Sequence, residues 1–171
     1  MEFRDIIERR RSIRAYTSEP IDRNAIDRIL HAVVRAPSAG NLQAVRVYLV
    51  RDRARRRRLA EAAQNQEFVA SAPVDLVFFA DPARSRAKYG IRGEHLYCVQ
   101  DATIAATYAN LAATNEGLAS GWVGAFDDEK VRQACSEPDL LPVAIVPVGH
   151  GAEEPPPTSR RPPAEIVREL D

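Results

Sequence analysis

Residues Arg92–Gly117 read RGEHLYCVQDATIAATYANLAATNEG, a stretch that predicts one long helix over 92–116. A glycine placed just after a helix favours the left-handed conformation that closes its last turn, so Gly117 is expected to end it. Small side chains let neighbouring elements approach a helix closely, and we therefore expect this helix at the centre of the fold. The small residues are Ala102, Ala105, Ala106, Ala109, Ala112 and Ala113.

Shorter patterns on both sides of this helix predict an alternation of helices and strands. Helical spacing of apolar residues and capping signals predict helices over 2–10, 22–36, 52–63 and 127–135. Apolar runs predict strands over 45–50, 73–80 and 143–148, and a short strand or turn over 121–125. This order, with helices on both faces of a small sheet, fits an α+β or an α/β fold. A single domain over 1–171 is expected, with a proline-rich arm that extends over about 152–171.

The composition excludes several classes of protein. The 171 residues are 45% hydrophobic and 28% charged, as expected for a folded domain. Basic and acidic residues balance at 24 each, so the chain as a whole is not expected to be a general nucleic-acid coat. Positive charge is nevertheless concentrated in residues 1–58, which hold 15 arginines against 7 acidic residues. No apolar run has the length of a membrane span, and a signal peptide is not evident. Two cysteines 37 residues apart support neither a disulfide framework nor a metal site, and we expect a reduced, cytoplasmic location.

A basic segment near the N-terminus has the composition of a phosphate site. Residues 9–14 read RRRSIR, with four guanidinium groups and one hydroxyl within six residues. Guanidinium groups bind phosphate oxygens in pairs, and serine adds a neutral donor. A chain that turns at Ser12 would direct Arg10, Ser12 and Arg14 to one dianion. On spacing alone, a solvated basic turn is the alternative.

Two glycine-containing segments suit a flat ligand. Residues 36–43, APSAGNLQ, combine small residues with two side-chain amides that suit a polar ring edge. Residues 120–126, SGWVGAF, place the only tryptophan between two glycines, where backbone N–H groups are accessible. A capped loop and a tryptophan in the core are the alternatives. The sequence offers no convincing catalytic side chain, so its chemistry is expected to belong to a bound cofactor.

Taken together, these segments resemble the FMN-dependent nitroreductase family, and more closely its short members, over essentially the whole chain. The resemblance rests on the order and spacing of motifs that are each modest alone. They are Arg10–Arg14, Ala36–Gln43, Ser71–Val74, Gln100–Ala102, Gly117–Phe126 and Ser159–Pro162. The resemblance implies an α+β fold with a central, mostly antiparallel sheet flanked by helices. It also implies an intertwined homodimer with FMN at the subunit interface.

The resemblance also implies which residues would contact FMN. The phosphate and the ribityl chain would be held by Arg10, Ser12, Arg14 and Arg160, with Arg11 near the pyrimidine edge. The ring would be lined from the other subunit by Pro37, Ser38, Ala39 and Asn41. The face that carries N5 would be covered by Trp122, Val123, Gly124 and Ala125, and the Gly124 backbone would tune N5. The pyrimidine edge would be read by one of Gln64, Asn65 and Gln66. No catalytic side chain and no metal are implied.

The implied reaction is the reduction of a nitroaromatic, quinone or flavin-type acceptor by NADH or NADPH, in two hydride-transfer steps through N5. The chain departs from the family where Ala44-Val45 replaces a usual Pro-Trp. Thr158 stands where larger members carry a second basic residue, so phosphate binding would depend more on the remaining arginines. The short stretch over 81–93 leaves room for a small lid at most.

Two alternatives remain open at this point. The first is a specialised relative, such as a reductive dehalogenase, a flavin-cleaving enzyme or an azoline dehydrogenase, which would need further recognition residues. The second is a flavin- or nucleic-acid-binding module without turnover, which would rest on Arg9–Arg14 and Arg51–Arg58. A nucleic-acid-binding protein of this kind would be colourless and would bind with steep salt dependence.

Overall fold

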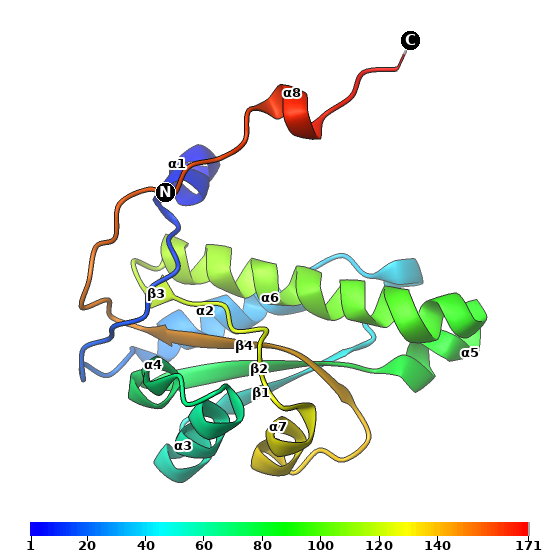
Figure 1. Ribbon diagram of the computed structural model, residues 1–171, viewed down its shortest axis with the longest axis horizontal. Helices are drawn as coiled ribbons and strands as arrows, with labels where there is room; N and C mark the ends of the chain where they lie inside the picture. Colours follow the sequence, from blue (N-terminus) through cyan, green and yellow to red (C-terminus); the bar gives the residue numbers. More distant parts are fainter. Residues whose placement is uncertain (171) are drawn as a thin grey trace.

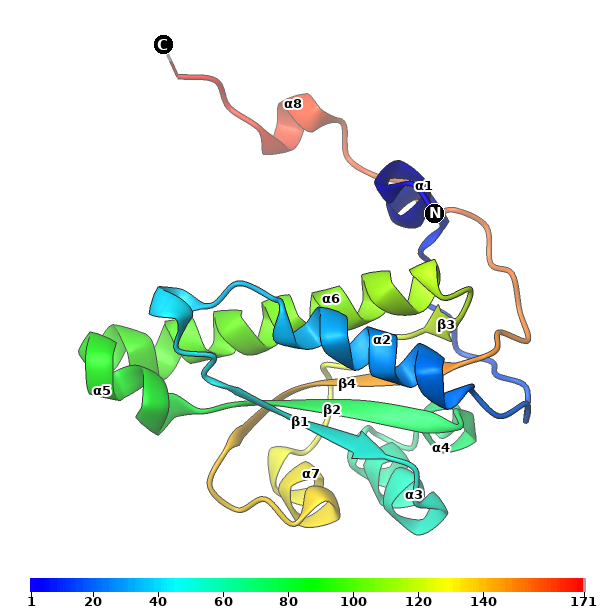
Figure 2. The same cartoon turned by 180° about the vertical axis from the view of Figure 1, so that it is seen from behind.

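The computed structural model describes residues 1–170, which form a four-stranded antiparallel sheet between two layers of helices (Figure 1). The strand order is β1-β2-β4-β3. The strands are β1 (Val45–Val50), β2 (Val74–Ala80), β3 (Ala119–Ser120) and β4 (Leu141–Gly149). Helices α2 (Arg23–Val34) and α6 (Cys98–Asn115) cover one face. Helices α3 (Arg53–Ala62), α4 (Glu67–Ser71) and α7 (Asp128–Cys135) cover the other (Figure 2). The predicted α+β fold is confirmed.

The two helical layers enclose a core on each face of the sheet, and β2 lies at its centre. Every residue of β2 is buried, and its side chains alternate between the two cores. The alanines of α6 lie against the sheet and α2, with Ala106 and Ala109 fully buried. Close packing without bulky side chains therefore places α6 where the sequence predicts it, along the middle of one face.

The predicted helix over 92–116 is helical from Arg92 to Asn115, but it is not one regular α-helix. The chain instead forms α5 (Pro82–Arg92), a π-helical turn η2 (Gly93–Tyr97) and then α6. Gly90 has φ +60° and breaks the helical backbone, and a Cβ on Gly93 would lie 2.5 Å from the Ser85 carbonyl oxygen. Gly90 lies before the predicted start at Arg92, so this break falls outside the predicted helix, and the helix α5 that contains it was not predicted. At the other end, Gly117 with φ +72° ends α6 as predicted.

Both ends of the chain project from the body, as Figure 1 shows. Helix α1 (Phe3–Arg9) has no buried residue, and α8 (Pro163–Ile166) lies on an exposed extension over 152–170. Phe3, Ile7 and Ile166 are 69%, 49% and 61% exposed. Apolar side chains gathered on projecting segments are unusual for an isolated chain and typical of segments that contact another molecule. No helix among the described residues combines the length and the apolar character needed to span a membrane.

Asp75 is a buried carboxyl group in the middle of β2. It is 0% exposed, and neither of its oxygens has a hydrogen-bond partner within residues 1–170. Burial raises the pKa of Asp75 well above its usual range, and the charge of Arg56 opposes this shift. The folded protein therefore keeps this group neutral over a pH range in which an unfolded chain ionises it.

The Asp75→Asn variant is expected to gain stability relative to the parent protein as the pH rises. Above about pH 4 the unfolded chain releases the Asp75 proton while the folded chain retains it. The parent therefore loses up to ~1.4 kcal/mol of unfolding free energy per pH unit until its folded pKa is reached. Urea unfolding of both proteins at pH 4.5 and pH 7 measures this difference. A difference that stays constant between the two pH values would contradict the expectation.

Candidate functional site

The segment after α1 lies beside β3 and the chain that leaves β4. Ser12 forms a parallel bridge with Ser120, and the Ile13 N–H donates to the Ser120 carbonyl at 3.0 Å. The Tyr16 hydroxyl donates to the Ile13 carbonyl at 2.8 Å, and burial together with nearby negative charge raises the pKa of Tyr16, so it stays a donor. The structure thus brings the basic segment and the tryptophan segment of the sequence together.

The arginine side chains of the basic segment, residues 9–14, differ in whether they are already bonded within the protein. The Arg11 guanidinium folds back onto the end of α1 and donates to the Glu8 carbonyl at 2.5 Å. By contrast, the guanidinium groups of Arg10 and Arg14 make no hydrogen bond or ion pair with any residue from 1 to 170. The backbone is nevertheless fixed, because the Arg14 N–H donates to Glu153 at 2.5 Å. The segment holds a rigid backbone from which two guanidinium groups are free to bind an anion.

Backbone N–H groups of the tryptophan segment alternate between two directions. The N–H groups of Gly121 and Val123 donate to Pro147 and Ile145 of β4, at 3.1 and 2.9 Å. The N–H groups of Trp122 and Gly124 find no protein acceptor in the described part of the chain. Trp122 is 38% exposed. The segment therefore presents unpaired donors beside an accessible aromatic side chain, which suits the polar edge of a flat ligand.

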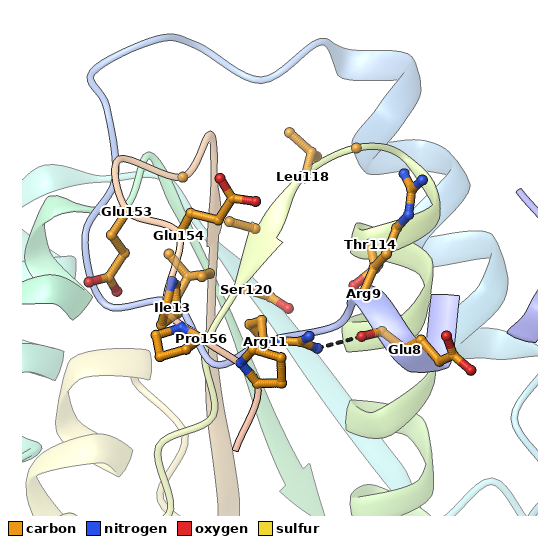
Figure 3. Close-up of a pocket in the computed structure, with 15 residues that line it drawn as sticks. Glu8, Arg9, Arg11, Ile13, Thr114, Leu118, Ser120, Glu153, Glu154 and Pro156 are labelled. Atoms are coloured by element: carbon orange, nitrogen blue, oxygen red, sulfur yellow. Dashed lines mark hydrogen bonds between the residues drawn. The ribbon is translucent and has the colours of Figure 1, made fainter. Parts of the chain in front are cut away.

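A cavity lies next to this segment, and the charges that line it do not suit an anion. Its volume is about 840 Å³, and Figure 3 shows the hydrogen bond between Arg11 and Glu8 among the residues that line it. Three carboxylates line it against two guanidinium groups, and neither Arg10 nor Arg14 lines it. A phosphate would therefore meet net negative charge there. The charged lining residues are Glu8, Arg9, Arg11, Glu153 and Glu154.

The second predicted segment forms a constrained loop around η1 (Ala39–Asn41). Three residues have left-handed backbone angles, with φ +54° at Gly40, +56° at Asn41 and +51° at Gln43. The buried Asp101 carboxylate accepts from the Ala39 and Ala44 N–H groups, at 2.9 and 3.3 Å. Left-handed conformations at non-glycine residues cost energy, and they persist here because Asp101 fixes both sides of the loop.

Helix α6 keeps this loop apart from the basic segment. Asp101 contacts the loop, whereas Asn110 accepts from the Ser120 hydroxyl at 2.8 Å, beside the Ser12 bridge. Asn110 follows Asp101 by nine residues in α6, which separates the two contacts by about 14 Å along the helix axis. One chain therefore brings the basic and tryptophan segments together but does not bring the loop into contact with them.

Arg160 and the turn over 64–66 are the remaining predicted parts of the site. Arg160 lies on the exposed arm and donates only to its neighbours Thr158 and Ser159. The turn over 64–66 has φ +59° at both Gln64 and Asn65, and it precedes α4. Its neighbour Ala62 accepts from the Asp127 N–H at 2.9 Å, so the turn lies near the end of the tryptophan segment.

Sequence reasoning missed the two carboxylates that fix the site backbone, Asp101 and Glu153. Asp101 belongs to a motif that the sequence singles out, but its partners lie 62 and 57 residues away in the chain. Glu153 lies 139 residues from its partner Arg14. No local pattern identifies contacts at such separations.

The chain is similar to known proteins over most of its length. The model of the Nitroreductase family matches residues 7–67 and 61–150. The chain is 34% identical to the NADH dehydrogenase of Thermus thermophilus, over 93% of this chain and 91% of that protein. It is 33% identical to the FMN reductase [NAD(P)H] of Bacillus subtilis, over 84% of this chain and 63% of that protein.

Among solved structures, the NADPH:FMN oxidoreductase of Vibrio harveyi complexed with NAD+ superposes with a TM-score of 0.90. The two chains are 28% identical, and the match covers 99% of this chain and 77% of that one. The family model covers both the loop around η1 and the tryptophan segment, which are the elements of the candidate site. This chain therefore belongs to the nitroreductase family.

Proposed function

We propose that this chain is an FMN-dependent NAD(P)H oxidoreductase that reduces nitroaromatic, quinone or flavin-type acceptors. Its membership of the nitroreductase family and its relatives named FMN reductase and NADPH-flavin oxidoreductase support that class of enzyme. The observation that carries the proposal is that the Ser12–Ser120 bridge joins two segments with unused donors. Among the described residues, the Trp122 and Gly124 N–H groups and the Arg10 and Arg14 guanidinium groups have no protein partner. When bound, FMN supplies a ring position that accepts a hydride and later releases it.

The residues present fit this cofactor in charge and in hydrogen bonding. Arg10 and Arg14 supply two cations with no protein partner among the described residues, and Ser12 between them supplies a hydroxyl, as a phosphate requires. The Gly124 N–H supplies a donor for a ring nitrogen or oxygen. The backbone donors of the tryptophan segment are fixed to β4 and are preorganised before any ligand arrives. The Arg10 and Arg14 side chains extend from a backbone that the Ser12–Ser120 bridge fixes to β3. The exposed Trp122 side chain would exclude water from one side of a bound ring.

The site is completed by a second copy of the chain. Within one chain, the Pro37–Asn41 loop is held at a different point of α6 from the basic segment. A second copy would bring its own loop, and the exposed apolar residues of α1 and α8 would be covered in the same contact. Arg160, which lies on the projecting arm, would then reach a phosphate bound to the partner or to its own chain.

The arginines of α3 argue against the alternative of a nucleic-acid-binding module, because two of them form hydrogen bonds within the protein. The Arg55 guanidinium donates to the Ala134 carbonyl at 2.6 Å, and the Arg56 guanidinium donates to the Ala70 carbonyl at 2.6 Å. These two side chains fasten α3 to α7 and α4. Fewer cations than the sequence suggests are available to a nucleic acid.

The absorption spectrum of the purified protein tests the proposed function. We expect flavin bands at one FMN per chain, either on purification or after FMN is added and excess removed. NADH or NADPH should bleach these bands without oxygen, and a nitroaromatic or a quinone should restore them. A protein that retains no added FMN would overturn the proposal.

A further inference from the structure

Helix α5 lies against the loop that is proposed to line the ring. A Cβ built on Gly40 would collide with the Tyr89 hydroxyl and would lie 2.7 Å from the Lys88 Nζ. Arg84 lies one turn before Lys88 and donates to the Leu42 carbonyl of the same loop. The short stretch between β2 and α6 therefore places cationic and aromatic side chains at the loop, in addition to any role as a lid.

The cations of this region are not neutralised by nearby acids. Arg86 pairs with Glu94 at 2.7 Å and is thereby occupied. Arg84, Lys88 and Arg92 form no ion pair with a carboxylate in the described residues. Asp81 instead caps α5 by accepting from the Arg84 N–H at 2.9 Å, and Asp101 is buried under the loop. The surface beside the loop therefore carries an excess of positive charge that attracts anions.

An aromatic surface continues from these cations to the loop. The Tyr89 and Tyr97 rings meet edge to face at 5.2 Å, and the Arg92 guanidinium lies 5.5 Å from the Tyr97 ring centroid. Tyr97 also lines a cavity of about 550 Å³ together with Pro37, Ser38 and Ala39. The Arg92 guanidinium is thus held against the Tyr97 side chain, which lines the same cavity as the residues predicted to contact the flavin.

We propose that Lys88 and Arg92, with Tyr97, bind the anionic group of a flat substrate that enters beside the Pro37–Asn41 loop. The inference rests on the proposed function, because the loop is assigned to the flavin ring by that function. The shared chemistry is a phosphate or a carboxylate attached to an aromatic substrate. Its two sources are the ribose phosphate that distinguishes NADPH from NADH and the acid group of an electron acceptor.

The test replaces Lys88 and Arg92 together with glutamine in the full-length protein. Arg58→Gln is the matched control, because Arg58 is an exposed cation on α3, on the other face of the sheet. FMN content is measured first in each protein. Rapid-mixing reduction then compares NADPH with NADH, and steady-state turnover compares 4-nitrobenzoate with the uncharged 4-nitrobenzamide. Calorimetric titration with NADP+ and with NAD+ gives a binding readout that does not depend on turnover.

We expect the double variant to keep its FMN and to lose about tenfold in kcat/KM or in affinity for the charged member of one pair, as expected for lost charge-assisted contacts. The uncharged or less charged member should change less than about twofold, within the usual effect of a surface substitution. A loss confined to the NADPH pair identifies the nucleotide phosphate as the ligand, and a loss confined to 4-nitrobenzoate identifies the acceptor.

Equal effects on both members of both pairs would overturn the inference, as would the absence of any effect. Failure of the proposed function is distinguished from this result, because the parent protein would then hold no FMN at all.

Discussion

Replacing Arg14 with alanine is expected to weaken FMN binding by about 1.5–3 kcal/mol, a roughly 10- to 150-fold rise in Kd. The Arg14 guanidinium has no protein partner among residues 1–170, so its removal leaves no buried group unsatisfied. The lost free energy would therefore report the contact with the ligand. Quenching of FMN fluorescence during titration with the protein measures the Kd.

Arg58→Ala serves as the control for this prediction. Arg58 is likewise an exposed cation but lies on α3, away from the site. Its loss is expected to leave the Kd for FMN within about twofold, in line with a distant surface charge. An Arg14→Ala protein with the affinity of the control would show that the phosphate site is assigned to the wrong residues.

Replacing Asp101 with asparagine is expected to lower both the stability of the protein and its affinity for FMN. The carboxylate accepts two backbone N–H groups, from Ala39 and Ala44, and an amide can accept only through its single oxygen. One buried N–H group then loses its partner, which costs about 1–3 kcal/mol of unfolding free energy. The loop also loses one of its two attachments, and we expect FMN affinity to fall at least about tenfold.

Urea unfolding without FMN and FMN titration separate the two effects of this substitution. Asp128→Asn is the control for a change from carboxylate to amide. Asp128 lies in the first turn of α7, and its side chain accepts no hydrogen bond within residues 1–170. If Asp101→Asn lowers the unfolding free energy but leaves FMN affinity at the control value, the loop does not contribute to the FMN site.

The fold was largely predictable because its signals are local. Alternating or continuous apolar residues define β1 and β2, and the terminating glycine of α6 acts through its own backbone angle. Helix α4 was not predicted, since five residues are too few for a helical period to be visible. Helix α5, with the break at Gly90, was not predicted either, and the predicted central helix began only after this break.

The sequence predicts candidate ligand-facing residues but not the residues that support them. Arginine, serine and glycine carry chemistry that a short segment displays by itself, so the segments around Ser12 and Gly124 could be proposed as parts of a site. Asp101 and Glu153 act only through backbone groups brought to them by folding. The separation of the loop from the basic segment is equally a property of the folded helix, because it depends on where each segment attaches to α6.

FMN binding by a mixed dimer tests most directly the claim that two copies of the chain build each site. One chain carries Arg14→Ala and the other Asp101→Asn, and two different affinity tags isolate the mixed dimer. If the loop of one chain completes the site of the other, one site of the mixed dimer receives an intact loop and an intact Arg14. The account predicts one FMN per mixed dimer, bound with the parental Kd. Binding no tighter than in either variant homodimer would contradict it.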